Sequence, residues 1–138
     1  MRVGPKPLEE KRQNNRGKRS RYERYTDELG RSKEKMAMVA LSKGPLPAWI
    51  KSYRRANHQE DLQGKDIVVM TDLGEVYLQI KSSAEGCNQF MREHPEGDIV
   101  AIMIKATDAL DFIRNNLVWA AERLRRKLMR QRGIRRSA

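Results

Sequence analysis

The stretch from Asp61 to Ser83, DLQGKDIVVMTDLGEVYLQIKSS, decides the fold because it contains two strand-like runs that meet at a turn. Residues 67–70 are continuously apolar, which is typical of a strand buried on both faces, whereas residues 75–81 alternate between polar and apolar. Gly74 lies between the runs and suits a tight connection, because glycine readily adopts a positive φ angle. The stretch therefore predicts a β-hairpin.

The polar side chains of this hairpin are the candidates for chemistry. Side chains alternate across a strand, so Gln79 and Lys81 point to the same face. Folding the hairpin back places Asp66 opposite Gln79 or its neighbour, and a slip of one residue would turn Asp66 to the other face. In the favourable register a carboxylate, an amide oxygen and an ammonium group converge. Such a group can hold a hard cation and place a lysine beside it.

These residues resemble the core motif of the PD-(D/E)XK nuclease superfamily, which has the restriction-endonuclease-like fold. In that superfamily an acidic residue on the second core strand and an (Asp/Glu/Gln)-x-Lys triplet on the third bind magnesium and cleave phosphodiester bonds. The resemblance implies that Asp66 and Gln79 are metal ligands, together with the backbone carbonyl of Ile80, and that Lys81 is the catalytic lysine. Gln79 departs from the glutamate of many members, and members that have lost catalysis exist.

A helix upstream of the hairpin supplies a further candidate. Residues 30–43 contain good helix formers and end before the Gly44-Pro45-Leu46-Pro47 segment, which cannot continue a helix. Members of the superfamily often carry a glutamate on the helix before the first strand, and the resemblance gives that role to Glu34. Glu34 would then ligate a second metal ion or a metal-bound water. An ordinary solvent-exposed glutamate would have the same spacing.

The remaining pattern predicts the fold class. Residues 48–56 fit either a short helix or a first strand, and the resemblance favours the strand. Residues 84–94 predict a helix, residues 99–104 a buried strand, and residues 107–130 a capped long helix. We therefore expect an α/β fold with a small mixed four-stranded sheet, flanked by helices in the order αβββαβα. The resemblance implies that this fold is restriction-endonuclease-like.

Positive charge is concentrated at the two ends of the 138-residue chain, which has a formal net charge of +11. Residues 1–25 contain nine lysines or arginines and three glutamates, and residues 123–138 contain eight basic residues and no acidic one. Polar, basic segments of this kind bury too little apolar surface to fold alone. We expect a disordered basic arm at residues 1–26, a nuclease-like domain at 27–131 and a basic tail at 132–138.

The charge predicts a nucleic-acid partner, and the resemblance makes DNA the expected one. Basic side chains bind phosphates, and serine hydroxyl groups can do the same, although the two serines that follow the motif could equally cap the next helix. The arm could also be a solvated tail. The residues expected to contact nucleic acid are Arg16, Lys18, Arg19, Arg21, Arg54, Arg55, Ser82, Ser83, Arg123, Arg126, Lys127 and Arg130.

The composition of the chain excludes several kinds of site and partner. The single cysteine, Cys87, excludes an internal disulfide and a cysteine-rich zinc site, and it favours the reducing cytoplasm. No apolar run is long enough to span a bilayer, so no membrane partner is expected. The apolar stripe of the last helix is compatible with a homodimer, although packing against the sheet is the default.

Two functions are compatible with this sequence. The first is a nuclease that uses Mg²⁺ or Mn²⁺ to hydrolyse phosphodiester bonds in nucleic acid, with DNA as the expected substrate. The second is a non-catalytic nucleic-acid-binding protein, or a structural RNA-binding protein, on the same fold. The second alternative has no use for a metal site at Asp66 and Lys81.

Overall fold

The computed structural model of the chain describes residues 21–133, and its side chains are described from Ser32 onward. The chain divides into two units, Met1–Arg31 and Ser32–Ala138. In the first unit only the helical backbone of residues 21–31 is described. Every strand of the described chain belongs to the second unit.

The described chain contains four strands and four helices, and its fold class is mixed α/β as predicted. One short helix between the first two strands is added to the expected αβββαβα order. The elements are α2 (Arg21–Ser42), β1 (Ile50–Arg55), α3 (His58–Leu62), β2 (Ile67–Thr71), β3 (Gly74–Lys81), α4 (Ala84–Glu93), β4 (Ile99–Met103) and α5 (Leu110–Gln131).

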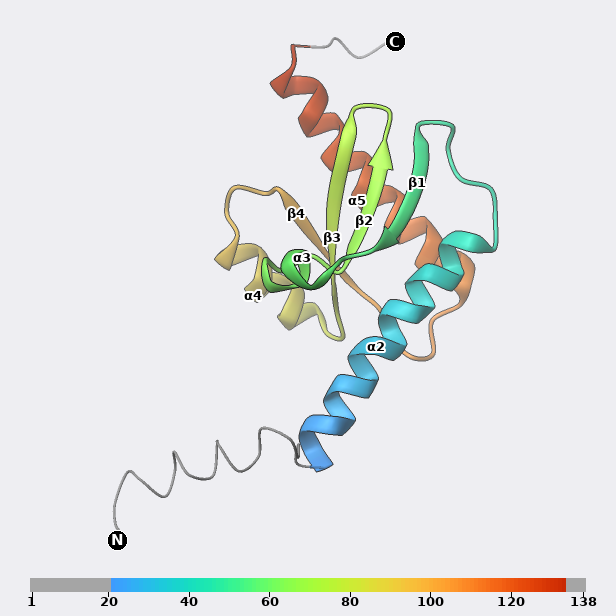
Figure 1. Cartoon of the computed structure of the whole chain (residues 1–138), viewed down its shortest axis with the longest axis vertical. Helices are drawn as coiled ribbons and strands as arrows, with labels where there is room; N and C mark the ends of the chain where they lie inside the picture. Colours follow the sequence, from blue (N-terminus) through green and yellow to red (C-terminus); the bar gives the residue numbers. More distant parts are fainter. Residues whose placement is uncertain (1–20, 134–138) are drawn as a thin grey trace, which may run out of the picture. The chain divides into compact units, whose positions relative to one another are not determined.

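The four strands form one open mixed sheet in the order β1-β2-β3-β4 (Figure 1). Strands β1 and β3 each run antiparallel to β2, and β4 runs parallel to β3 at the edge of the sheet. The predicted β2–β3 hairpin is confirmed, and Gly74 has a φ angle of 129°. Two parallel neighbours need a crossover connection, which α4 provides between β3 and β4.

One face of the sheet forms the hydrophobic core. The side chains of Val76, Leu78 and Ile80 point to this face and are buried. Helix α5 packs against it through the residues Ile113, Leu117, Ala120, Ala121 and Leu124. The apolar stripe of α5 is buried in the core, so the default expectation of packing against the sheet is the one observed, and the structure does not support a homodimer through that stripe.

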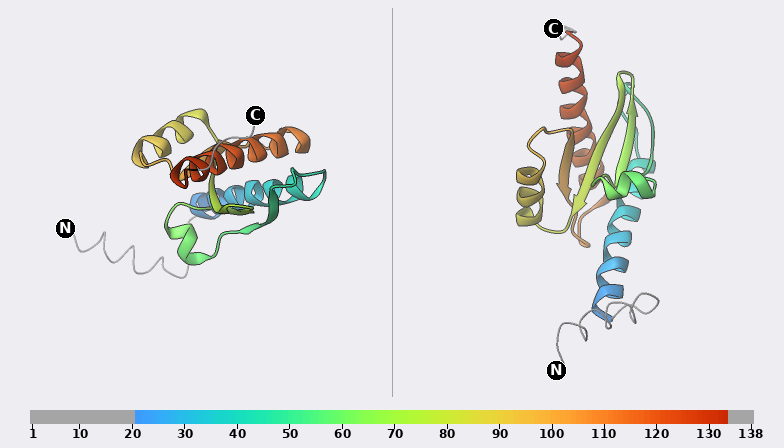
Figure 2. Two further views of the ribbon diagram at one scale, coloured as in Figure 1. Left: turned by 90° about the horizontal axis from the view of Figure 1, so that it is seen from above. Right: turned by 60° about the vertical axis from the view of Figure 1, so that its left-hand side comes forward.

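The other face of the sheet carries the half-buried polar side chains Tyr77, Gln79 and Lys81. Helix α4 lies on this side, since a Cβ atom at Gly86 would be only 3.6 Å from the Cβ atom of Lys81. Figure 2 shows α4 and α5 on opposite sides of the sheet. Any site built from the polar residues of β3 therefore lies on the α4 side, away from the core.

The structure differs from the prediction at two helices. Helix α2 begins at Arg21, nine residues before the predicted start at residue 30. The last helix starts at Leu110 after Ala109, which makes no side-chain cap hydrogen bond. Asp108, near the predicted start of this helix, instead accepts a hydrogen bond from the backbone N–H of Lys105 at 2.8 Å, which stabilises the preceding turn.

The short helix α3 is stabilised at its start by a reciprocal pair of hydrogen bonds. The side chain of Asn57 accepts a hydrogen bond from the backbone N–H of Glu60 at 2.9 Å. The carboxylate of Glu60 accepts one from the backbone N–H of Asn57 at 2.8 Å. This reciprocal pair is a capping box, which satisfies two backbone donors that would otherwise lack partners.

Candidate active site

The hairpin register brings Asp66 beside Gln79. Ile67 pairs with Leu78, so the preceding residue Asp66 lies opposite Gln79. The backbone N–H of Asp66 donates to the carbonyl oxygen of Leu78 at 2.8 Å, which extends the ladder by one residue. The favourable register of the prediction is therefore the one observed. It turns Asp66 to the same face as Gln79 and Lys81.

Asp66 is a buried acidic residue, with 7% of its surface exposed. Its Oδ2 atom accepts a hydrogen bond from the backbone N–H of Ile80 at 2.8 Å. In the amide orientation that satisfies hydrogen bonding, the nitrogen of Gln79 donates to the same Oδ2 atom at 3.3 Å and to the carbonyl oxygen of Gly64. Two donors therefore converge on one oxygen of the Asp66 carboxyl group.

The pKa of Asp66 is raised from 3.8 to about 7. Burial is the main cause, because it disfavours the charged form, whereas the N–H of Ile80 stabilises the carboxylate and acts in the opposite direction. The negative charges of Glu34 and Asp61 raise the pKa further. A hydrogen bond between the carboxyl groups of Asp61 and Asp66 adds to this effect, since it requires a proton on one of them.

Glu34 reaches the surroundings of Asp66 from a different element. It lies on α2 and is half-buried, with 28% of its side chain exposed. One carboxylate oxygen of Glu34 is 3.8 Å from a guanidinium nitrogen of Arg55 on β1. Because its charge also raises the pKa of Asp66, Glu34 is close enough to influence the buried carboxyl group. The structure thus brings the predicted residues Glu34, Asp66 and Gln79 into one region.

Lys81 lies at the other end of this region. It is two residues beyond Gln79 on the same face of β3, a distance of about 6.7 Å along the strand. Its ammonium group is 5.6 Å from the centroid of the Phe90 ring on α4, in a cation–π contact. Lys81 is half-buried between the strand and α4. Its contact with Phe90 directs the amine toward α4.

The oxygen atoms near Asp66 determine whether the site suits a metal ion. The two backbone groups of a strand residue point to the same side, so the carbonyl oxygen of Ile80 faces the same way as its N–H, toward Asp66. Within the described part of the chain, however, no three histidine, cysteine, aspartate or glutamate side chains are arranged to hold a metal ion. A cation here would depend on Asp66, the amide of Gln79, the carbonyl of Ile80 and water.

Asp61 is a further acidic residue of this region. It lies in α3, and its carboxyl group is within hydrogen-bonding reach of Asp66. The capping box that begins with Asn57 fixes the short helix and so positions Asp61. The spacing of Asn57 and Glu60 is a sequence signal for that helix. No sequence signal indicated the contact between Asp61 and Asp66, because it depends on the fold.

The basic residues of β1 are already engaged by acidic partners. Arg54 forms two hydrogen bonds with Glu60, at 2.7 and 2.8 Å, and a further one with Glu75 at 3.3 Å. The hydrogen bonds with Glu60 raise the pKa of Arg54. Arg55 lies 3.8 Å from Glu34. A nucleic-acid phosphate would therefore have to compete with these carboxylates for either arginine.

The two serines after the motif have different environments. The hydroxyl group of Ser83 accepts a hydrogen bond from the backbone N–H of Gly86 at 3.0 Å, so Ser83 caps α4. Ser82 is exposed and precedes the cap. The sequence left open whether Ser83 contacts phosphate or caps the next helix, and the structure shows that it caps the helix. Contact of either serine with phosphate stays a prediction.

The predicted basic residues of α5 also differ in their contacts. Arg123 lies over the ring of Trp119, with 5.0 Å between the guanidinium carbon and the ring centroid. Arg126 is 3.4 Å from Glu122, and Arg130 is exposed. The amine of Lys127 is 2.7 Å from Asp98 and also donates to the carbonyl of Glu96, so it holds the loop before β4.

The predicted contacts in the N-terminal arm cannot be placed in the structure. Arg16, Lys18 and Arg19 lie outside the described residues. Arg21 lies at the start of α2, where the backbone alone is described. The tail beyond Gly133 is also outside the described range.

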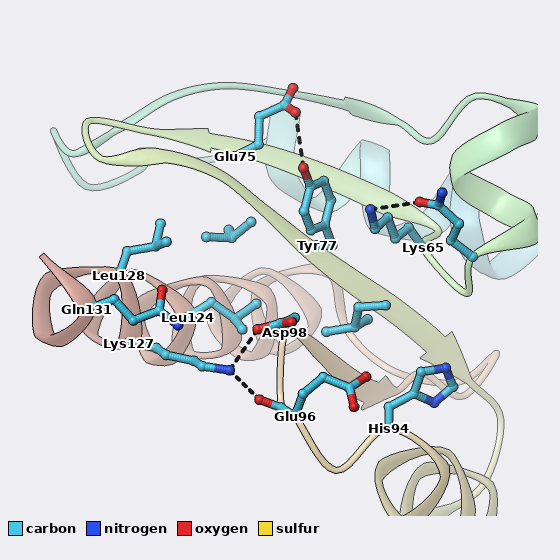
Figure 3. A pocket seen from close by; sticks show the side chains of 13 residues that line it. Lys65, Glu75, Tyr77, His94, Glu96, Asp98, Leu124, Lys127, Leu128 and Gln131 are labelled. Atoms are coloured by element: carbon cyan, nitrogen blue, oxygen red, sulfur yellow. Dashed lines mark hydrogen bonds and ion pairs between the residues drawn. The ribbon is translucent and has the colours of Figure 1, made fainter.

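A cavity of about 410 Å³ lies near the start of β4, next to the C-terminal part of α5 (Figure 3). Several of its polar side chains already have partners inside the protein. Lys65 donates to Gln63 at 2.9 Å, and the hydroxyl group of Tyr77 donates to Glu75 at 3.3 Å. A polar ligand would have to displace these contacts, so the cavity is a weaker candidate than the region around Asp66.

Comparisons of the chain with protein-family models, with curated proteins and with solved structures found no significant match. The resemblance to the PD-(D/E)XK superfamily therefore stays a prediction from the residues themselves. No helix in the described part of the chain is both long and apolar enough to cross a membrane.

Proposed function

We propose that the protein is a magnesium-dependent phosphodiesterase with a restriction-endonuclease-like fold, and that it cleaves DNA. The observation that supports this proposal is the environment of Asp66. A buried carboxyl group lies beside Gln79, and its burial, together with the negative charges of Glu34 and Asp61, raises its pKa to about 7. A divalent cation would relieve this crowding of negative charge, so the region has the electrostatics of a cation site.

Each residue has a defined role in the proposal. Asp66 would ligate the ion directly, and the carbonyl of Ile80 would add a second oxygen. Gln79 would contribute its amide oxygen after the amide turns over, because its nitrogen faces Asp66 in the orientation that satisfies hydrogen bonding. Few protein ligands suffice, since Mg²⁺ usually keeps several waters. When bound, the ion would polarise the scissile phosphate and lower the pKa of a bound water.

Glu34 and Lys81 act around this centre. Glu34 holds a metal-bound water or a second ion from the side of α2. Lys81 leaves the ring of Phe90 to orient the attacking water and to stabilise the negative charge that develops on the phosphate. Mn²⁺ can take the place of Mg²⁺, because both prefer oxygen ligands.

The charge distribution supports nucleic acid as the partner. Residues 123–138 contain eight basic residues and no acidic one, and residues 1–25 are also strongly basic. Such segments bind phosphates without regard to sequence, and their affinity falls steeply with added salt. The proposal places the protein in the cytoplasm, in line with its one free cysteine, Cys87.

Plasmid cleavage tests the catalytic proposal. The full chain is incubated with supercoiled DNA and Mg²⁺, and relaxation is followed on gels, with EDTA as the metal-free control. We expect Asp66→Asn and Lys81→Ala to lower the rate at least about 100-fold, the usual loss for a catalytic group. Lys65→Ala is the matched control, because Lys65 precedes Asp66 but contacts the ring of Tyr77, 3.8 Å from its centroid.

Two results would contradict the catalytic assignment. Cleavage that survives Lys81→Ala at the wild-type rate would show that Lys81 does no chemistry. An equal loss in Lys65→Ala would point to damage of the fold, which circular dichroism of the three variants would reveal. The absence of any cleavage by the wild-type protein, with nucleic acid still bound, would support the alternative below.

One observation favours a non-catalytic nucleic-acid-binding protein as the second candidate. Gln79 is neutral, and its amide nitrogen satisfies Asp66 without any metal. The ammonium group of Lys81 is likewise held by Phe90. Isothermal titration separates the two candidates. Salt-sensitive binding of DNA or RNA by a protein that takes up neither Mg²⁺ nor Mn²⁺ would support the second.

A further inference from the structure

One side of α5 combines exposed aromatic rings with exposed arginines. Phe112 and Trp119 are 53% and 54% exposed, although large aromatic residues are usually buried. They are seven residues apart, which places them on the same side of the helix about 10.5 Å apart along its axis. Their side is opposite to Leu117 and Leu124, which pack into the core. The rings therefore contribute little to the hydrophobic core.

The same side of the helix becomes basic toward its C-terminus. Arg123 stacks over Trp119, with its guanidinium carbon 5.0 Å from the ring centroid. Arg126 and Arg130 follow at the helical spacing that keeps them on this side. Arg126 has 42% of its side chain exposed and pairs with Glu122 at 3.4 Å. We call Phe112, Trp119, Arg123, Arg126 and Arg130 the aromatic-basic face.

We propose that the aromatic-basic face binds single-stranded nucleic acid, with Trp119 as a stacking platform for an unpaired base. Every nucleobase has a flat face that stacks on an aromatic ring, and arginines alongside can bind the phosphates of the same strand. Arg123 lies over one face of the Trp119 ring, so the base stacks on the other face of this exposed ring and the guanidinium group is close enough to bind a phosphate of the same strand. A base pair inside a duplex has its faces covered by its neighbours, so this surface fits unpaired nucleotides better.

The spacing of the two rings also fits a strand. Phe112 and Trp119 are about 10.5 Å apart along the helix, which corresponds to about three nucleotide steps at 3.4 Å each. The half-buried Asn116 lies between them on this side and can offer its amide to a base edge. A strand that stacks on both rings would then run toward Arg123 and Arg126, where its phosphates meet positive charge.

Charge argues against the other occupants of this face. A symmetric dimer with parallel α5 helices would bring an identical arginine cluster against Arg123, Arg126 and Arg130, which is repulsive. The chain segments at residues 1–20 and 134–138 carry a net positive charge, so they would also be repelled. A membrane surface would need more exposed apolar side chains than Phe112 and Trp119 provide.

This inference rests on the nucleic-acid part of the proposed function and is independent of the metal site. It goes further by naming the binding element and the form of nucleic acid. The test is therefore done in EDTA, where no cleavage can occur. A failure of catalysis leaves the outcome of this binding test unchanged, and the reverse also holds.

The test uses the fluorescence of Trp119 in the full chain. The protein contains two tryptophans, so Trp49→Phe leaves Trp119 as the single emitter. A 20-nucleotide oligothymidine is titrated in at low salt, and a blunt duplex of equal length is titrated separately. We expect the single strand to quench Trp119 and to bind more tightly than the duplex. Stacking places the base in direct contact with the indole ring.

Variants of the full chain then measure how much the aromatic-basic face contributes to the affinity for the single strand. In fluorescence anisotropy with a labelled oligothymidine, Trp119→Ala is expected to raise the dissociation constant about tenfold, the usual effect of losing one stacked base. Leu62→Ala is the matched control, because Leu62 is an exposed apolar residue on α3, with 73% exposure. It should change the dissociation constant less than about twofold.

Several outcomes would overturn the proposal. The first is binding of the single strand with unchanged Trp119 emission and an equal effect of Trp119→Ala and Leu62→Ala. The second is tighter binding of the duplex than of the single strand.

A dimer on size-exclusion chromatography that Trp119→Ala dissociates would assign the face to a second copy. Quenching by phosphatidylglycerol vesicles but not by oligothymidine would assign it to a membrane surface. Failure to bind either nucleic acid would also refute the nucleic-acid part of the proposed function.

Discussion

Replacing Asp66 with asparagine tests the central feature of the candidate site, a buried carboxyl group that keeps its proton near neutral pH. The pKa of Asp66 is raised from 3.8 to about 7, chiefly by burial. Asparagine has nearly the same size and keeps an oxygen that can accept the N–H of Ile80. The substitution therefore removes the ionisation and leaves the hydrogen bond at 2.8 Å possible. It separates the charge of Asp66 from its packing.

The effect on stability depends on pH in a defined direction. At a pH below the ordinary pKa, Asp66 is protonated in both states and has no pH-dependent effect. As the pH rises toward 7, the unfolded chain releases the proton while the folded protein keeps it. The free energy of unfolding then falls by about 1.4 kcal/mol per pH unit. The loss reaches about 4 kcal/mol near pH 7 and stays constant above it.

Urea unfolding at several pH values between about 4 and 8.5 measures this loss. We expect the D66N variant to gain stability relative to the wild type as the pH rises, by up to about 4 kcal/mol. Asp72→Asn is the matched control with the opposite sign. Hydrogen bonds from Arg125 lower the pKa of Asp72, so its ionised form is the favoured one in the folded protein. The wild type should therefore be more stable than the D72N variant above pH 4, and this difference in stability should disappear in acid.

Adding Mg²⁺ to the same experiment connects stability to function. A ligand that binds only the folded state raises its stability with ligand concentration. In the proposed site, Mg²⁺ at pH 8 should stabilise the wild type and leave the D66N variant unchanged. A constant stability difference between wild type and D66N at all pH values would refute the pKa argument. Equal effects of Mg²⁺ on both proteins would refute the metal site.

Two further substitutions test neighbouring parts of the structure. Glu34→Gln should lower the pKa of Asp66, because it removes one of the negative charges that raise it, and carbon-13 NMR titration of the Asp66 carboxyl group would detect the shift. An unchanged titration would place Glu34 too far away to act. Ser83→Ala should lower the free energy of unfolding by about 1 kcal/mol in thermal denaturation, because the hydroxyl group caps α4. Ser82→Ala, at the exposed neighbour, is its control and should have little effect.

The hairpin shows how much of the fold can be predicted from residues that are close together in the sequence. The apolar run 67–70, the alternating run 75–81 and Gly74 between them were enough to predict the turn and both strands. Each of these signals depends on residues close together in the chain. They also set which side chains of β3 share a face. The prediction of Gln79 and Lys81 on one side needed no tertiary information.

Other parts of the fold depended on distant contacts. Residues 48–56 were ambiguous between helix and strand, and pairing of β1 with β2 decides for the strand. The early start of α2 at Arg21 was not predicted, although Ser20 and Glu23 stand at capping-box spacing in the sequence. The short helix α3 carries the same signal, since Asn57 and Glu60 stand at capping-box spacing.

The sequence by itself determined the hairpin, the face that Gln79 and Lys81 share and the basic character of both chain ends, because each follows from neighbouring residues. Only the tertiary structure decided that Asp66 is buried opposite Gln79, that Asp61 and Glu34 approach it, and that Trp119 is left exposed. These features depend on hairpin register and on the packing of separate helices, and both arise when segments distant in the chain compete for the same core.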